Sequence, residues 1–230
     1  MKATVVLAID AGNTRIKWGV HDGRAWTITG VLPTAESGRV GDGWASLARI
    51  DRAVACNVAG ADVERNLVAA CARHRISLAM ATSRAEQLGV VNGYRDPAQL
   101  GADRWAALVA AWRRSTAVDL FPPACVVVNA GTAVTVDALD SDGVFRGGLI
   151  LPGMRLMLQA LAENTAGLRV APGESAGDPH QRAGQDENPG AGAPHATPPL
   201  TLRSETQGGS QKSQNGSSWT RVVTSEAILA

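Results

Sequence analysis

The chain reads VVLAIDAGNTRIKWGV over residues 5–20 and CVVVNAGTAVTVDAL over residues 125–139. Each stretch opens with a short apolar run rich in β-branched residues, which predicts a strand covered on both faces. A turn with glycine and threonine follows, and then a second run of strand character, so each stretch predicts a hairpin. The repetition predicts two similar lobes, and two such turns facing each other could hold a polyphosphate.

Around these hairpins, the pattern is that of a mixed α/β protein. Residues 51–58 predict a further strand, and residues 63–74 carry apolar side chains at helical spacing. Residues 103–114 and 154–161 predict two more helices, the second of which follows a Pro-Gly turn. Strands that alternate with helices in this way favour an α/β architecture.

Composition and charge exclude several classes of protein. The 230 residues are 45% apolar and 19% charged, with a net charge of +1, which offers no bulk footprint for nucleic acid or an anionic membrane. No stretch approaches the roughly 18 apolar residues of a membrane span, and the N-terminus lacks the long apolar run of a signal peptide. The three cysteines form no CxxC pair, which excludes a disulfide framework. We expect a cytoplasmic protein that binds neither nucleic acid nor membrane.

The composition changes after about residue 172. Residues 176–221 contain only three large apolar side chains: Leu200, Leu202 and Trp219. So little apolar area cannot offset the entropy lost in ordering the segment. Residues 173–230 are therefore predicted to be a polar tail that is disordered or divergent, and a loop-rich segment draped on the core is the alternative. The short apolar run at residues 222–230 could form a helix that docks back.

The turn of the first hairpin has the residue types of an anion site. Gly12 lets the backbone approach a ligand closely, and turn amides can converge on an anion. Asp10, at the end of the strand, could hold a hydrated Mg²⁺ ion. Side-chain donors and positive charges come from Asn13, Thr14, Arg15 and Lys17. An ordinary hairpin turn is the alternative, because Asn and Gly are common turn residues.

Two further glycine-containing regions are candidate sites. In the Gly-Ala-Asp-Arg stretch at residues 101–104, Asp103 is either a helix cap or a general base. Arg104 is either a solvated charge or a clamp for a carboxylate. Residues 129–133 and 147–153 place glycines at strand ends, which indicates either a close backbone approach to a ligand or tight turns between strands.

In this order, the motifs resemble those of type III pantothenate kinases. The resemblance covers about the first 170 residues, and it rests on DAGNTRIK at 10–17, NGYRDPAQLGADR at 92–104, NAGTA at 129–133 and GGLILPG at 147–153. It implies the α/β fold of acetate and sugar kinases, actin and heat-shock ATPases, with two ribonuclease-H-like lobes of mixed sheets flanked by helices. It also implies transfer of the ATP γ-phosphoryl group to pantothenate, the first step of coenzyme A synthesis.

The resemblance implies a role for each matching residue. The ATP-binding residues would be Asp10, Ala11, Gly12, Asn13, Thr14, Arg15, Ile16, Lys17 and Thr132. Pantothenate would be contacted by Tyr94, Gly101, Ala102, Asp103 and Arg104, with Asp103 as the proton acceptor. Family members are typically homodimers that need Mg²⁺, which Asp10 would hold through water, and a monovalent cation, K⁺ or NH₄⁺.

The chain departs from the family pattern in two places. The family usually has an aspartate that ligates the monovalent cation where this chain has Asn129, whose amide oxygen carries no net charge. The second lobe of the family normally continues with strands and helices beyond the point where this chain becomes polar. Thr224 is the candidate here for a threonine that contacts pantothenate late in the family sequence. These departures leave an alternative function, a catalytically impaired homologue that binds nucleotide or regulates another protein.

The expected organisation has three parts. Residues 1–116 would form the N-terminal ribonuclease-H-like lobe, and residues 117–172 would begin a second, incomplete lobe. Residues 173–230 would form the polar tail.

Overall fold

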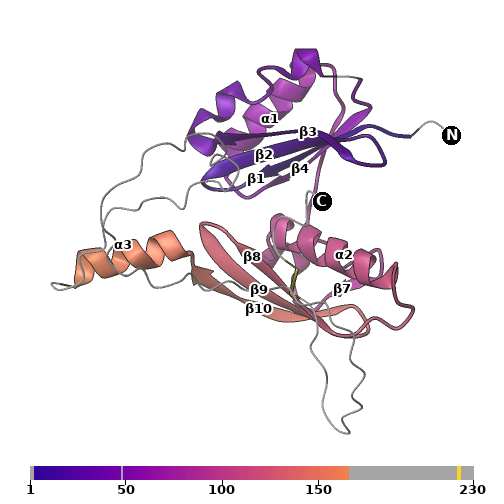
Figure 1. The fold of residues 1–230 in the computed structure, drawn as a ribbon, viewed down its shortest axis with the longest axis vertical. Helices are drawn as coiled ribbons and strands as arrows, with labels where there is room; N and C mark the ends of the chain where they lie inside the picture. The colour runs from indigo at the N-terminus through magenta and orange to yellow at the C-terminus, as the bar shows by residue number, and fades with distance from the viewer. Residues whose placement is uncertain (1–2, 48, 166–221, 224–230) are drawn as a thin grey trace, which may run out of the picture. The chain divides into compact units, whose positions relative to one another are not determined.

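The computed structural model describes residues 3–47, 49–165 and 222–223. The chain divides into two compact units, residues 1–158 with 217–230, and residues 159–216. The described part of the second unit is the end of helix α3 (Met154–Asn164) and Thr165. The described residues form two sheets, which Figure 1 shows, and both belong to the first unit.

The first sheet has five strands in the order β3-β2-β1-β4-β5. Three of them form an antiparallel meander: β1 (Val6–Ala11), β2 (Arg15–His21) and β3 (Trp26–Pro33). Two continue the sheet parallel to β1: β4 (Arg52–Asn57) and β5 (Leu78–Met80). Helix α1 (Ala61–Arg73) connects β4 to β5 and covers one face of this sheet (Figure 1), as a crossover between parallel strands must.

Strand alternation separates the first core from the candidate site. Every second residue of β1 is buried: Leu7, Ile9 and Ala11. Helix α1 packs an apolar stripe into the same core: Val63, Leu67, Ala70 and Cys71. Because successive side chains of a strand point to opposite faces, Asp10 lies on the face away from α1.

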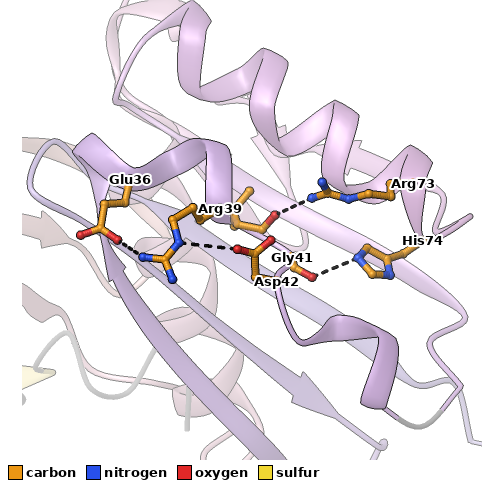
Figure 2. A network of polar contacts seen from close by, with 7 residues as sticks. Glu36, Arg39, Gly41, Asp42, Arg73 and His74 are labelled. Atoms are coloured by element: carbon orange, nitrogen blue, oxygen red, sulfur yellow. Dashed lines mark hydrogen bonds and ion pairs between the residues drawn. The ribbon is translucent and has the colours of Figure 1, made fainter.

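Polar contacts hold the loop after β3 against the end of α1 (Figure 2). The Arg73 Nη2 group donates to the carbonyl oxygen of Val40 at 3.2 Å, and the His74 Nε2 atom lies 3.0 Å from the carbonyl oxygen of Gly41. Arg39 adds two exposed ion pairs, with Glu36 and Asp42. Exposed pairs stabilise little, so the two carbonyl contacts matter most here.

The second sheet has the order β11-β8-β9-β10-β7-β6. Its centre is an antiparallel meander of β8 (Cys125–Ala130), β9 (Ala133–Leu139) and β10 (Val144–Pro152). Short strands extend it on both sides: β6 (Glu86–Gln87), β7 (Val90–Asn92) and β11 (Val222–Val223). The two central hairpins, β1–β2 and β8–β9, are the two that the repeated sequence pattern predicts.

The second core forms between this sheet and helix α2 (Ala102–Thr116). The helix buries an apolar stripe that includes Trp105, Leu108 and Trp112. The sheet contributes Cys125, Val127, Leu139 and Phe145. Residue 116, where the sequence places the division between the lobes, is thus the end of a helix that packs on the second sheet. An apolar stripe shows that a helix is buried but not against which sheet.

The prediction of two mixed sheets flanked by helices is confirmed, and so are the three predicted helices. Several described elements were not predicted: the strands β3, β5, β6, β7 and β10 and the 3-10 helices η1 (Thr34–Arg39), η2 (Trp44–Ser46) and η3 (Pro97–Gln99). The glycine-rich stretch at residues 147–153, predicted as a turn or ligand loop, lies largely within β10, which bends at a bulge between Phe145 and Gly147.

Most of the predicted polar tail, residues 173–230, lies outside the described residues. Within it, Val222–Val223 form a strand that pairs with β8, in place of the start of a helix. No helix in the part of the chain that the structure describes is long and apolar enough to cross a membrane. No disulfide links the three cysteines, all of which lie in that part.

Candidate active site

The two hairpin turns and the starts of helices α2 and α3 line a single cleft, with a volume of about 530 Å³. Its charged lining residues are Asp10, Arg15, Lys17, Asp103 and Arg155. Its uncharged polar lining residues are Asn13, Thr14, Asn129, Thr132 and Thr135. The cleft thus combines three cations with two carboxylates, the charge types that a metal-bound anion needs.

Asp10 and Lys17 occupy directly opposite positions on β1 and β2. Burial raises the pKa of the Asp10 carboxyl above its ordinary value. The ammonium group of Lys17 lowers this pKa, and the carboxylate of Asp103 raises it further. A cation in the cleft therefore favours the charged form of Asp10.

The first turn is closed by hydrogen bonds to its backbone. The Gly12 amide donates to the Arg15 carbonyl at 3.0 Å, and the Thr34 hydroxyl donates to the Gly12 carbonyl at 2.7 Å. Ala11 and Ile16, which flank the turn, are fully buried in the first core. Neither of these two predicted ATP-binding residues lines the cleft, and both anchor the turn in the core.

The second turn meets the first through its threonine. The Gly131 amide donates to the Ala133 carbonyl at 3.0 Å, which closes the turn. The Thr132 hydroxyl lies 2.7 Å from the Thr14 hydroxyl, a hydrogen bond that links the two turns. The Gly153 amide donates to the Thr132 carbonyl at 2.9 Å, which ties the start of α3 to the same turn. The structure thus brings together the two turns that the sequence repetition singles out.

Asn129, at the end of β8, presents an unsatisfied oxygen in the cleft wall. Its Nδ2 group donates to the Thr135 hydroxyl at 3.4 Å, a long hydrogen bond. Its Oδ1 atom is buried and accepts no hydrogen bond from any described residue. A buried acceptor without a partner is unfavourable by about 1–3 kcal/mol, so this oxygen is suited to a donor or cation supplied by a ligand.

Asp103 lies in the first turn of α2 and lines the cleft. Its side chain makes no capping hydrogen bond, because the N-cap position belongs to Gly101. The Cys56 thiol, on β4 beside Asp10, lies 3.7 Å from the Ala102 carbonyl. Burial raises the pKa of Cys56 to about 12, with Asp10 and Asp103 adding to the rise. Because Gly101 occupies the N-cap position, the helix-cap interpretation of Asp103 is wrong. Its carboxylate is left to act in the cleft.

Arg104 is not a solvated charge, because only 7% of its surface is exposed. Its Nε atom donates to both carboxylate oxygens of Asp137 at 3.1 Å, and its Nη2 atom also bonds Asp137. Asp137 itself is completely buried. Asp137 was not predicted as a site residue; its one visible signal in the sequence is a lone acid in a strand of otherwise apolar and small residues.

Tyr94 reaches the same cluster from the segment after β7. Its ring packs on that of Phe145 at a centroid distance of 5.1 Å, and the Arg104 guanidinium lies 5.9 Å from the Phe145 centroid. The pKa of Arg104 is raised, first by its hydrogen bonds to Asp137 and also by Tyr94. Two residues predicted to bind pantothenate, Tyr94 and Arg104, thus belong to one cluster.

Two of the three glycines in residues 147–153, Gly148 and Gly153, serve the packing of the protein. A Cβ atom on Gly148 would collide with the Asp137 carboxylate, and it would lie 2.6 Å from the Val136 carbonyl oxygen. A Cβ on Gly153 would collide with the Gly131 carbonyl and lie 2.6 Å from that of Thr132. At both positions the close neighbour is the protein itself and not a ligand. The predicted alternative, a tight turn between strands, does not describe Gly148 either, because it lies within β10.

Two further outcomes concern single residues. Arg155, in the first turn of α3, lines the cleft and was not predicted, because nothing in the sequence ties it to the second turn. Thr224, the candidate for a late substrate contact, lies outside the described residues. Among the described residues, no group of three or more His, Cys, Asp and Glu side chains is arranged to hold a metal ion.

Comparison with known proteins points to one family. A family model described as type III pantothenate kinase matches residues 6–186. A type III pantothenate kinase of Aromatoleum aromaticum is 49% identical over 179 residues, which are 78% of this chain and 72% of that protein. Proteins of the same name from Nitrosospira multiformis and Dechloromonas aromatica are 45% and 42% identical, over 74% and 75% of this chain and 63% and 70% of theirs.

Proposed function

Because this chain belongs to the type III pantothenate kinase family, we propose that it transfers the γ-phosphoryl group of ATP to the primary hydroxyl of pantothenate, giving 4'-phosphopantothenate. The chain matches only 63–72% of the length of the relatives compared, so the activity of the whole enzyme is part of the proposal. The observation that carries it is the cleft in which two glycine-threonine turns face the carboxylates Asp10 and Asp103.

The two turns are suited to hold the phosphates of ATP. Turn amides and the hydroxyls of Thr14 and Thr132 are donors, and Lys17 supplies a positive charge beside Asp10. Phosphoryl transfer asks mainly for alignment and charge stabilisation. Fixed donors in a cleft meet that need, because their orientation does not change during the reaction.

The residues present fit the two cations that the family resemblance implies. Asp10 offers the single carboxylate with which proteins commonly hold a hydrated Mg²⁺ ion beside phosphates. The unsatisfied Oδ1 of Asn129 offers a neutral oxygen for K⁺ or NH₄⁺. Bound there, these ions would neutralise charge on the phosphate oxygens.

Asp103 is proposed to accept the proton of the pantothenate hydroxyl as its oxygen attacks phosphorus. Its carboxylate lines the cleft without serving as a helix cap. Arg104 and Tyr94 are proposed to contact pantothenate, the former through the substrate carboxylate. We also propose that the active form is a cytoplasmic homodimer.

The test measures turnover of the purified full chain with Mg-ATP, and the formation of ADP and phosphopantothenate is followed. The assay is run with and without pantothenate, and with and without K⁺ or NH₄⁺. Pantothenate-dependent ADP release is expected. The Asp103→Asn variant should lower kcat by roughly 10²–10⁴-fold and retain ATP binding, whereas the exposed control Asp142→Asn should not change kcat. ATP binding without turnover in the wild-type protein would instead favour an impaired nucleotide-binding homologue.

A further inference from the structure

The Arg104–Asp137 pair joins helix α2 to the centre of the second sheet. Arg104 lies in the first turn of α2, directly after Asp103, and Asp137 lies on β9. Both are buried, with 7% and 0% of their surfaces exposed. A buried carboxylate keeps its charge only with a partner, so the two side chains hold each other in one geometry.

The pairing uses one side of the guanidinium. Arginine has five N–H donors in a planar fork, and Asp137 engages the Nε and Nη2 atoms. The Nη1 atom takes no part in these bonds to Asp137. The Asp137 carboxylate therefore fixes the plane of the Arg104 guanidinium. A second carboxylate can then bind in that plane, on the other side of the guanidinium.

The surroundings of Arg104 restrict the same plane. The Phe145 ring lies 5.9 Å from the guanidinium, and Tyr94 packs against Phe145. On the opposite strand, Gly148 leaves room for the pair, since a Cβ there would lie 2.8 Å from Arg104 Nη2 and would collide with the Asp137 carboxylate. These neighbours, together with Asp137, hold the guanidinium in its observed orientation.

We propose that Asp137 is a positioning residue, which fixes the Arg104 guanidinium so that its remaining donors receive the carboxylate of the acceptor substrate. The inference rests on the proposed function, because it takes the acceptor to be pantothenate. Asp137 acts through Arg104 and touches no reacting atom. Its orienting effect outweighs the repulsion that its negative charge exerts on a substrate carboxylate.

The experiment compares pantothenate with its neutral primary amide as acceptors of the full-length enzyme. In Asp137→Asn, we expect the KM for pantothenate to rise about 10- to 100-fold, the size of a lost charged hydrogen bond. We expect the preference for pantothenate over the amide to fall by a similar factor and the KM for ATP to stay unchanged. A purely structural role would lower stability and leave this preference intact.

A second variant covers the case in which Asp137→Asn does not fold. Asp137→Glu keeps a negative charge to pair with Arg104, so it leaves no buried charge unpaired, but its extra methylene displaces the guanidinium and should also reduce the preference for pantothenate. Arg146→Gln breaks an exposed ion pair with Asp140 in the same sheet and serves as the control with unchanged preference.

Three results would overturn the proposal: a folded Asp137 variant with the wild-type preference, a KM for pantothenate below that of the wild type, or failure of both variants to fold. The last would mean that the pair serves folding alone. If the wild-type protein does not phosphorylate pantothenate, the proposed function is refuted instead. The wild-type measurement therefore distinguishes failure of the proposed function from failure of the proposal about Asp137.

Discussion

Replacing Gly148 by alanine should strongly destabilise the protein. The added Cβ would lie 2.6 Å from the Val136 carbonyl oxygen, a backbone atom of the paired strand β9, and it would collide with the Asp137 carboxylate. Something must shift at such distances, and neither neighbour is the end of a flexible exposed side chain. The methyl group must therefore push apart either the β9–β10 ladder or the Arg104–Asp137 pair.

The expected magnitude follows from these two costs. Overpacking a tight site costs about 1–3 kcal/mol, and breaking a buried ion pair costs about 3–5 kcal/mol. The two overlap because the same shift relieves both, so a loss of at least about 3 kcal/mol is expected. For a chain of this size, that corresponds to a fall in Tm of roughly 6–12 °C.

Thermal and urea denaturation followed by circular dichroism measure this loss. Gly147→Ala is the first control: its backbone φ is +118° with no atom within 4 Å of the new Cβ, so only strain of about 1–3 kcal/mol is expected. Gly38→Ala has open space and no positive φ, and its stability should stay within about 0.5 kcal/mol of the wild type. A Gly148→Ala protein as stable as Gly38→Ala would refute the packing argument.

Three further results are expected. Asp10→Asn should be at least as stable as the wild-type apo protein at pH 7.5. Burial raises the pKa of Asp10 in the folded state above that of an aspartate in the unfolded chain. The wild-type protein therefore loses stability as the pH rises from the unfolded-state pKa through the raised folded-state pKa. The difference in Tm should vanish at pH 3, and a higher wild-type Tm at pH 7.5 would contradict the assignment. Thr132→Val removes the 2.7 Å bond to Thr14 and should raise the KM for ATP about 2- to 10-fold, whereas an unchanged value would separate this turn from nucleotide binding. Iodoacetamide at pH 8 should label Cys56 far more slowly in the native protein than in urea, because burial raises its pKa to about 12, and mass spectrometry showing equal rates would contradict that burial.

Local patterns predicted the elements that neighbouring residues control. The apolar run before Asp10 predicted strand β1 with Asp10 at its end, and the apolar spacing of residues 103–114 predicted helix α2. Both patterns depend only on residues within a few positions of each other, because strand and helix periods are properties of the local backbone. The short strands β5, β6 and β7 were missed because two or three residues show no period.

Long-range contacts decided the rest. Asp103 and Arg104 are adjacent in sequence, yet one lines the cleft and the other is buried against Asp137, 33 residues further along the chain. The same holds for Thr14 and Thr132, whose hydroxyls meet although 118 positions separate them. Sequence alone carried the residue types and their local spacing. Which buried charges pair, and which hydroxyls share a cleft, was decided only by the packing of two sheets, because a charge is stable in a core only where the fold brings its partner.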